Sequence, residues 1–354
     1  MKNILIVYNE IQHYREDFFN ELSKECNLTV LHSGSLLPGT QYKQIRGRLI
    51  SIGPLKYQFG VTKEILFNRY DAVIFLFNVA WLSNLVNALI VKLKPKTKSI
   101  LWGAWYTKSK AANLTRDLFS KLADSNIFYS PRAQQQFVAN GLKREKAFVA
   151  NNTFNVPRHV KAFNYDDKFR FLFVGSLNKR KDMPTLIHSF KEVLPLIPKN
   201  ICLTIIGSGE ERRYLESVVE SLDLDKRVKF LGKIEDSQIL EQYYRESLAS
   251  ISYGQAGLSV LQSLGFGTPF ITKLGAISGG EIENIKSSSN GFMCKNKEEL
   301  KDVLTLLGND LDLAQSLGLN AYRYYEKYCT IENMASGFLD AIDSTERSTI
   351  DFEH

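Results

Sequence analysis

Cysteine is scarce in this 354-residue sequence, and its spacing argues against a disulfide scaffold or a metal cluster. None of the four cysteines lies in a CxxC pair or beside a group of histidines. Thiols this far apart are typical of buried or inert side chains in a reducing compartment, so we expect a cytoplasmic protein without a metal site. They are Cys26, Cys202, Cys294 and Cys329.

Long apolar runs are also absent. A helix that spans a bilayer needs roughly 20 apolar residues. The nearest candidate, residues 80–91, is shorter and contains Ser83, Asn84 and Asn87, so we expect an amphipathic surface helix there. The short apolar run at residues 4–8 is interpreted as a first β-strand and not as a signal peptide.

Acidic residues are missing from one stretch of the first half. None lies between Asp71 and Asp117, and residues 1–150 hold 21 Lys+Arg against 10 Asp+Glu. Such a face is either merely solvated or suited to an anionic partner, namely acidic lipid headgroups or a pyrophosphate-linked acceptor. We do not expect nucleic acid, because no helix-turn-helix, RNP-like or zinc-finger pattern accompanies the charge. The lysines of this stretch are Lys92, Lys94, Lys96, Lys98, Lys108 and Lys110.

Short β-branched runs alternate with longer amphipathic segments along the chain. This alternation predicts an α/β fold with parallel sheets and helical crossovers. It stops in the polar segment 151–168, resumes with a strand at residues 170–175, and ends in a helical tail at residues 298–343. We therefore predict two doubly wound domains joined by a linker, with the ligand site at the carboxyl ends of the strands, where the two halves face one another.

Two segments of the second half have the features of an anion site. In FLFVGSLNKRKDMPTLI, residues 171–187, Gly175 ends a strand and three cations precede a helix whose N-terminus carries partial positive charge. In YGQAGLSVLQSLGFGTPF, residues 253–270, Gly254 and Gly257 free the backbone to approach a ligand ahead of another helix.

In this order the segments resemble the GT-B glycosyltransferases, especially family 4 of the retaining nucleotide-sugar enzymes. The likeness covers about residues 170–295 through VGSLNKRKDMPTLI, IIGSGEERRYLE, VKFLGKIEDSQI, GLSVLQSLGFGTPF and GGEIENI with NGF. The first half matches more loosely, through NEIQHYREDFFNEL and WGAW. The resemblance implies two Rossmann-like domains facing across a cleft. Residues 1–155 would bind the acceptor and 165–329 the nucleotide sugar, and a C-terminal helix at about 330–350 would pack back on the first domain.

The resemblance also assigns residues to the donor. Lys181 matches the lysine that holds the pyrophosphate, with Arg180 beside it and Gly175 at the turn. Ile234 and Asp236 match the nucleobase contacts. The loop whose N–H groups meet the distal phosphate and the sugar falls on Ala256, Gly257, Leu258 and Ser259.

Three residues that the family normally shows are replaced. Its paired glutamates fall on Gly254 and Gln262. A glutamine amide still binds ribose hydroxyls, at a cost of roughly tenfold in affinity at most. Gln255 is the candidate that reaches the sugar in place of Gly254. The histidine often found near the sugar is absent from WGAWYTKS, which leaves His13 and Glu10, in the loop after the first strand, as candidate catalytic residues.

The resemblance implies a retaining glycosyltransferase. It would move a sugar from a nucleotide-diphosphate donor to a hydroxyl of a glycan acceptor, lipid-linked and belonging to bacterial surface polysaccharide biosynthesis. No metal and no cofactor are expected beyond the donor substrate, and the enzyme is expected in the cytoplasm, peripheral at the inner face of the cell membrane. Two alternatives stay open: a GT-B-shaped scaffold or binding subunit without catalysis, and an inverting enzyme of the same fold.

Overall fold

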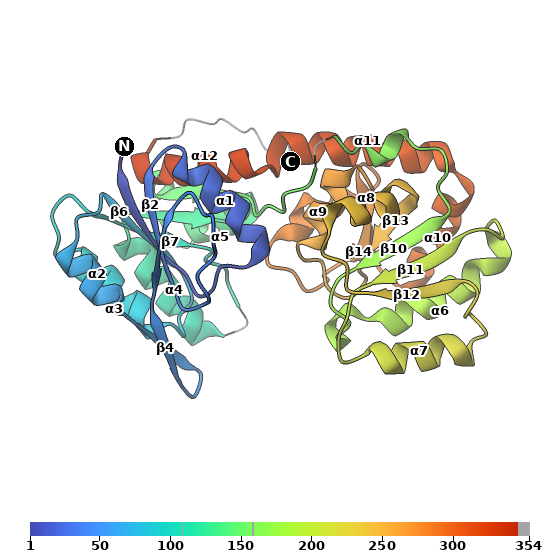
Figure 1. The fold of residues 1–354 in the computed structure, drawn as a ribbon, viewed down its shortest axis with the longest axis horizontal. Coiled ribbons are helices and arrows are strands. Elements are labelled where there is room, and N and C mark those ends of the chain that lie inside the picture. The colour runs from blue at the N-terminus through green and yellow to red at the C-terminus, as the bar shows by residue number, and fades with distance from the viewer. Residues whose placement is uncertain (108, 158, 346–354) are drawn as a thin grey trace. The chain divides into compact units, whose positions relative to one another are not determined.

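The computed structural model describes residues 1–107, 109–157 and 159–345 and divides into two compact units (Figure 1). The first unit contains residues 1–152 and the chain from Thr330 onward. The second unit contains Thr153–Cys329. Each is built on a parallel sheet with helical crossovers, so the predicted α/β class is confirmed.

The sheet of the first unit has the strand order β3-β2-β1-β6-β7-β8-β9. Its strands are β1 (Asn3–Val7), β2 (Asn27–His32), β3 (Lys43–Arg46), β6 (Ala72–Leu76), β7 (Lys98–Trp102), β8 (Ser125–Phe128) and β9 (Ala147–Val149). An antiparallel pair joins β4 (Arg48–Ile52) to β5 (Leu55–Phe59). The helices are α1 (His13–Ser23), α2 (Val61–Phe67), α3 (Leu82–Val91), α4 (Lys110–Leu122), α5 (Pro131–Ala139) and α12 (Ile331–Asp343).

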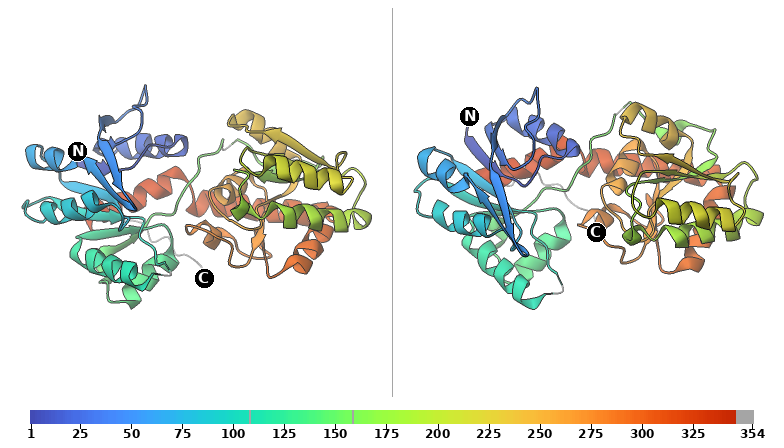
Figure 2. Two further views of the ribbon diagram at one scale, coloured as in Figure 1. Left: turned by 90° about the horizontal axis from the view of Figure 1, so that it is seen from below. Right: turned by 60° about the horizontal axis from the view of Figure 1, so that its bottom comes forward.

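Alternate residues of these strands pack on opposite faces of the sheet. Ile4 and Ile6 of β1 belong to one buried cluster, and Leu5 and Val7 to another, as the two-residue period of a strand requires. Helices α1 and α12 cover the first face (Figures 1 and 2). The ring of Phe338 on α12 lies 4.8 Å from Phe18 and 4.9 Å from Trp102, measured between ring centroids. The predicted return of the C-terminal helix to the first unit is therefore confirmed.

The sheet of the second unit has the order β12-β11-β10-β13-β14-β15. Its strands are β10 (Arg170–Val174), β11 (Cys202–Ile206), β12 (Val228–Gly232), β13 (Ser247–Ile251), β14 (Phe270–Lys273) and β15 (Gly291–Cys294). The helices are α6 (Met183–Val193), α7 (Arg212–Ser221), α8 (Ser237–Arg245), α9 (Ser259–Phe266), α10 (Lys297–Asn309) and α11 (Leu311–Tyr328). Strand order reverses between β10 and β13, and this switch point is where doubly wound sheets bind ligands.

The helix expected at residues 80–91 is present as α3, but the side that is buried is the polar one. In α3 the polar side chains of Ser83, Asn84 and Asn87 are buried. The exposed positions hold apolar side chains instead. No helix within the described ranges is both long and apolar enough to cross a membrane.

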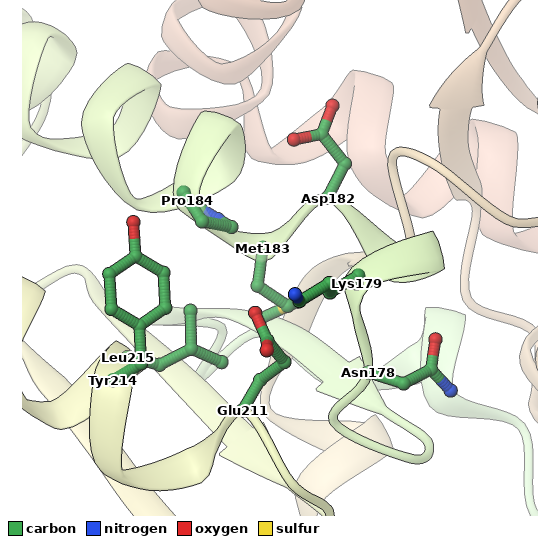
Figure 3. Close-up of a pocket in the computed structure, with 8 residues that line it drawn as sticks. All are labelled: Asn178, Lys179, Asp182, Met183, Pro184, Glu211, Tyr214 and Leu215. Carbon is green, nitrogen blue, oxygen red and sulfur yellow. The ribbon is translucent and has the colours of Figure 1, made fainter.

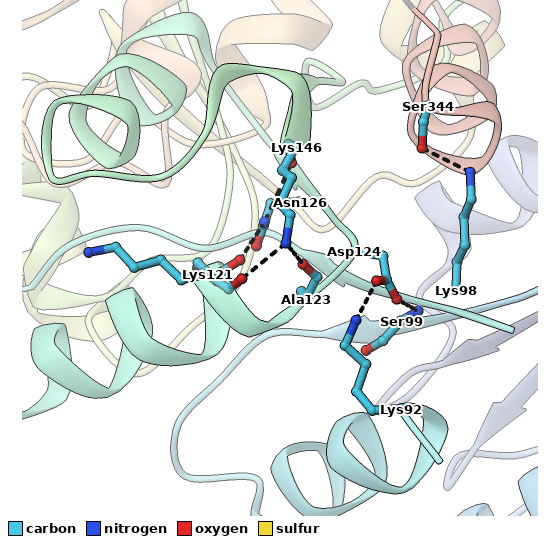
Figure 4. A network of polar contacts seen from close by, with 10 residues as sticks. Lys92, Lys98, Ser99, Lys121, Ala123, Asp124, Asn126, Lys146 and Ser344 are labelled. Carbon is cyan, nitrogen blue, oxygen red and sulfur yellow. Dashed lines mark hydrogen bonds and ion pairs between the residues drawn. The ribbon is translucent and has the colours of Figure 1, made fainter. Parts of the chain in front are cut away.

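Three of the lysines that follow α3 make contacts inside the first unit, and Figure 4 shows two of them, Lys92 and Lys98. Lys92 forms an ion pair with Asp124, and Lys94 donates to backbone carbonyls at the end of α2. The Lys98 ammonium donates to the carbonyl of Ile342 at 2.7 Å and to the hydroxyl of Ser344 at 2.8 Å, at the end of α12. These three lysines therefore tie helix ends together. Lys108 lies outside the described residues.

Candidate functional site

The two loops at the switch point of the second sheet are in direct contact. One follows β10 and ends in a 3-10 turn, Lys179–Lys181. The other follows β13 and leads to α9. The backbone N–H of Gly254 donates to the carbonyl of Lys181 at 3.0 Å, which joins the loops. The sequence-predicted residues Gly175, Lys181 and Gln255 are thereby brought together.

Lys181 is a buried cation at the centre of this contact. It is only 7% exposed, and its Nζ lies 3.5 Å from the carbonyl oxygen of Gln255. Its aliphatic end passes over Gly175, where an added Cβ would lie 3.7 Å from Cε. Burial, helped by the positive charge of Arg180, lowers the pKa of Lys181 to about 8, and Glu281 opposes the shift. A bound anion would supply the counter-charge that favours the ammonium form.

Gly254 occupies a position that has no room for a side chain. A Cβ there would lie 2.4 Å from the carbonyl oxygen of Arg180 and 2.8 Å from Cβ of Asp182. The turn that carries Lys181 therefore occupies the space that a glutamate side chain at residue 254 would need. Asp182 itself has a left-handed backbone with φ of 51°, and its Oδ1 accepts the Thr185 hydroxyl at 2.8 Å.

Hydrogen bonds hold the next part of the second loop, and the backbone after it is accessible. The Gln255 carbonyl accepts the Ser252 hydroxyl at 2.6 Å, and the N–H of Ala256 donates to the carbonyl of Ile277 at 2.9 Å. Nothing lies within 4 Å of a Cβ placed on Gly257. A ligand can therefore approach the backbone at Gly257. The half-buried Leu258 and Ser259 follow, and α9 begins at Ser259.

Gln262 of α9 is oriented by a buried tyrosine. The hydroxyl of Tyr244 donates to Oε1 of Gln262 at 3.2 Å, and Gln262 is only 6% exposed. Burial raises the pKa of Tyr244, so its hydroxyl remains a donor. Because the amide oxygen receives this bond, the NH₂ group is the part of Gln262 able to donate to a ligand hydroxyl.

The predicted nucleobase residues follow β12 at the same edge of the sheet. Ile234 is half-buried and Asp236 is exposed. Asp236 caps α8, because its Oδ1 accepts the N–H of Gln238 at 2.8 Å. The base contact that the sequence predicts for Asp236 stays a prediction.

A pocket of about 470 Å³ lies beside the turn that carries Lys181 (Figure 3). It opens between the beginnings of α6 and α7, and none of the residues predicted to bind the donor lines it. We place the donor candidate at the switch point and not in this pocket, because the buried cation and the open glycine backbone lie at the switch point. The pocket is lined by Asn178, Lys179, Asp182, Met183, Pro184, Glu211, Tyr214 and Leu215.

The candidate catalytic residues belong to the first unit, in the loop after its central strand β1. Glu10 is exposed, and its Cγ lies over Gly34, where an added Cβ would be 2.6 Å away. His13 begins α1, is exposed, and has its ring centroid 5.5 Å from that of Tyr14. Both residues thus share one loop at the switch point of the first sheet, between β1 and β6.

Two buried charges were missed by the sequence reasoning. Glu281 is 7% exposed, its Oε2 accepts the N–H of Gly279 at 2.9 Å, and it acts electrostatically on Lys181. The glycine pair before it was the available signal. In the first unit the buried guanidinium of Arg15 donates to Asn152 at 2.5 Å and lies 5.3 Å from the Trp102 ring. Within the described residues, no three His, Cys, Asp or Glu side chains form a group able to hold a metal ion.

Comparison with known proteins assigns a class to this fold. Residues 157–324 match the family model of the glycosyl transferases group 1. HepE from Anabaena, solved with UDP, superposes with a TM-score of 0.77 at 17% identity, over 97% of this chain and all of HepE. HepE has also been solved with UDP-glucose. The chain therefore has the GT-B fold of glycosyltransferases. The match to the glycosyl transferases group 1 lies within the second unit.

Relatives of known sequence carry glycosyltransferase names. An uncharacterised glycosyltransferase of Methanocaldococcus jannaschii is 30% identical over 211 residues, which are 57% of this chain and 52% of that protein. The alpha-monoglucosyldiacylglycerol synthase of Acholeplasma laidlawii is 23% identical over 273 residues, 74% of this chain and 67% of the synthase. The match thus spans about half to two thirds of the length of these relatives.

Proposed function

We propose that the protein is a glycosyltransferase that takes a sugar from a nucleotide-diphosphate donor bound at the switch point of its second unit. The buried ammonium of Lys181 beside the open backbone of Gly257 is the observation that carries this proposal. The diphosphate gains negative charge as the sugar leaves, and fixed positive groups stabilise that charge most effectively where water is excluded. Arg180, exposed on the same turn, adds a second cation.

The other predicted donor contacts extend this proposal. Gln262 donates its NH₂ group to a ribose hydroxyl, and Gln255 reaches the sugar. Ile234 and Asp236 contact the base, largely through the backbone. Leu258 and Ser259 offer backbone N–H groups at the start of α9, whereas the N–H of Ala256 already donates to the carbonyl of Ile277. HepE in its UDP and UDP-glucose forms, with the same fold, supports a nucleotide-sugar donor, which is a substrate and not a resident cofactor.

The acceptor belongs to the first unit in this proposal. We propose a glycan hydroxyl, lipid-linked, at the cytoplasmic face of the membrane and in the synthesis of a bacterial surface polysaccharide. The similarity to a synthase named for a glucosylated diacylglycerol supports an acceptor that carries lipid. Retention at the anomeric carbon rests on the likeness to family 4.

His13 and Glu10 are the proposed catalytic residues. Replacement His13→Ala or Glu10→Gln should lower turnover at least about tenfold if the side chain transfers a proton. The donor dissociation constant should stay within about twofold, because the donor binds the second unit. A variant that keeps full turnover removes its residue from the catalytic role.

A scaffold without catalysis is the second candidate, and one observation favours it. Gly254 replaces an acid of the active family and has no room for a side chain. Thermal shift with UDP, GDP and their sugars separates the two candidates. Stabilisation by one nucleotide, followed by hydrolysis of its sugar conjugates, supports the enzyme. No stabilisation by any of them, with the protein folded, supports the scaffold.

A further inference from the structure

The outer side of α3 is apolar where a surface helix is normally polar. Its three exposed positions hold Leu82, Val86 and Leu89. Leu93, just after the helix, is 81% exposed. The row follows the spacing of one helix face and continues it past the helix end. A row of large apolar side chains in contact with water favours a partner that covers it.

One of the buried polar residues of α3 is hydrogen-bonded to the sheet beneath the helix. The Nδ2 group of Asn84 donates to the carbonyl of Leu76 at the end of β6, at 2.8 Å. The Nδ2 group of Asn87 donates to the carbonyl of Ser83 at 2.7 Å. The bond from Asn84 to β6 makes the inverted orientation of α3 part of the fold, whereas the Asn87 bond lies within the helix and leaves the buried Oδ1 of Asn87 without a partner among the described residues.

Neighbouring helices extend the apolar surface. Leu66 and Phe67 at the end of α2, which contacts α3, are 54% and 79% exposed. Helix α4 exposes a second row at i, i+4 and i+8. Right-handed crossovers between the successive strands β6, β7 and β8 put α3 and α4 on one face of the sheet. We call this surface the α2–α4 face; its residues are Leu66, Phe67, Leu82, Val86, Leu89, Leu93, Leu114, Leu118 and Leu122.

The charge around the α2–α4 face is positive. Residues 60–124 contain ten lysines and arginines against four acidic residues. Each acid is hydrogen-bonded within the first unit: Glu64 to Tyr70, Asp71 to the N–H of Asn3, Asp117 to Tyr106, and Asp124 to Lys92. Lys63, Lys110 and Lys121 are exposed. Exposed cations therefore accompany the apolar rows.

We propose that the α2–α4 face docks on an anionic lipid surface. Apolar side chains on helices that lie in the plane of a membrane enter the boundary between headgroups and acyl chains, while neighbouring lysines meet the phosphates. The combination of leucine rows with an acid-poor, lysine-bearing surround matches that chemistry. The purpose of this docking rests on the proposed function, because binding to lipid would bring the first unit to a lipid-linked acceptor. The binding itself does not depend on catalysis.

The α2–α4 face differs from the run of lysines that the sequence indicates as the site for an anionic partner. Lys92, Lys94 and Lys98 are engaged in contacts inside the unit, so they contribute little to lipid binding. The apolar rows supply the main attraction, and the exposed lysines select anionic lipid.

Vesicle sedimentation tests the docking. The full chain is mixed at low salt with vesicles of phosphatidylglycerol and phosphatidylcholine, or of phosphatidylcholine alone. The wild type should bind the anionic vesicles, and Val86→Ser/Leu89→Ser/Leu93→Ser should bind at least about tenfold more weakly, because burial of large apolar side chains is lost. The matched control Leu196→Ser/Ile239→Ser/Leu306→Ser changes three exposed apolar residues of the second unit and should bind as the wild type does.

Three outcomes overturn the docking: no binding of the wild type to anionic vesicles, equal binding by the two triple variants, or a wild-type dimer that the α3 variant converts to a monomer without a change in vesicle binding. The last result would assign the face to a second copy of the chain. Donor hydrolysis without vesicles should be retained by the α3 variant. If neither the wild type nor any variant hydrolysed a donor, the proposed function would be wrong. The vesicle experiment would still decide the docking.

Discussion

The carbonyl oxygen of Arg180 lies 2.4 Å from the position that a Cβ atom of residue 254 would occupy. The backbone of the turn that carries Lys181 therefore leaves room only for glycine at residue 254. Restoring an acid by Gly254→Glu should displace that turn. It should lower the free energy of unfolding by about 1–3 kcal/mol, as overpacking does, and weaken nucleotide binding as well.

Gly257→Ala is the matched control for this substitution. A Cβ at residue 257 meets nothing within 4 Å, so urea unfolding of this variant should follow that of the wild type. A Gly254→Glu protein as stable as the wild type, with improved donor turnover, would contradict the close approach of the two loops.

The low pKa of Lys181 predicts a pH dependence of donor binding. Its folded-state pKa of about 8 lies below the ordinary 10.5. Above about pH 8 the amine is neutral in the free protein, so UDP affinity should fall by up to about tenfold per pH unit. The same shift costs the folded state stability below about pH 8, and the free energy of unfolding should rise between about pH 8 and 10.5, where only the unfolded chain keeps the proton.

Titration calorimetry with UDP from pH 7 to pH 10 measures this dependence. Lys179→Gln removes an exposed cation from the same turn and should keep the decline. Lys181→Gln should bind weakly at every pH. A pH-independent affinity in the wild type would separate Lys181 from the diphosphate.

The contact between Tyr244 and Gln262 predicts opposite effects of two conservative changes. Gln262→Glu offers a carboxylate to the Tyr244 hydroxyl and to ribose, and charged hydrogen bonds are stronger by about 1 kcal/mol, so nucleotide affinity should rise by up to about tenfold. Tyr244→Phe frees the amide of Gln262 to turn, and affinity should fall by a few-fold. Weaker binding by Gln262→Glu would show that the ligand needs the NH₂ donor at this position.

Lys98 should stabilise the first unit independently of any ligand. Its ammonium bonds the carbonyl of Ile342 and the hydroxyl of Ser344, which fastens the end of α12. Lys98→Met should lower the free energy of unfolding by about 1 kcal/mol, the net worth of a hydrogen bond. Lys96→Gln, at an exposed position of the same run, should leave urea unfolding unchanged.

The second unit was largely predictable because its strand-end glycines and helix starts are local signals. Turns such as the one at Gly175 and the helix after Gly257 follow from nearest neighbours in sequence. In the first unit, residues 43–67 form β3, the β4–β5 pair and α2, none of which the sequence indicated. These elements are short and half exposed, so they carry no clear period.

Two other features could not be predicted from the sequence because they depend on tertiary contacts. They are the orientation of α3 and the lack of space for a side chain at Gly254. Most residues of α3 are apolar, and the side that is buried depends on a tertiary contact, the hydrogen bond from Asn84 to the carbonyl of Leu76 in β6. The missing acid at Gly254 is visible in the sequence. The carbonyl that fills its space comes from Arg180, 74 residues earlier in the chain.

Nucleotide binding by wild type and Lys181→Gln tests the central claim most directly, with Lys179→Gln as the control. Calorimetry at pH 7 with UDP and GDP should show one nucleotide that binds the wild type and the control alike. The same nucleotide should bind Lys181→Gln at least about tenfold more weakly, since a buried charged contact to the diphosphate is removed. Equal affinity for wild type and Lys181→Gln, or no binding of either nucleotide by the folded wild type, would contradict a donor site at the switch point.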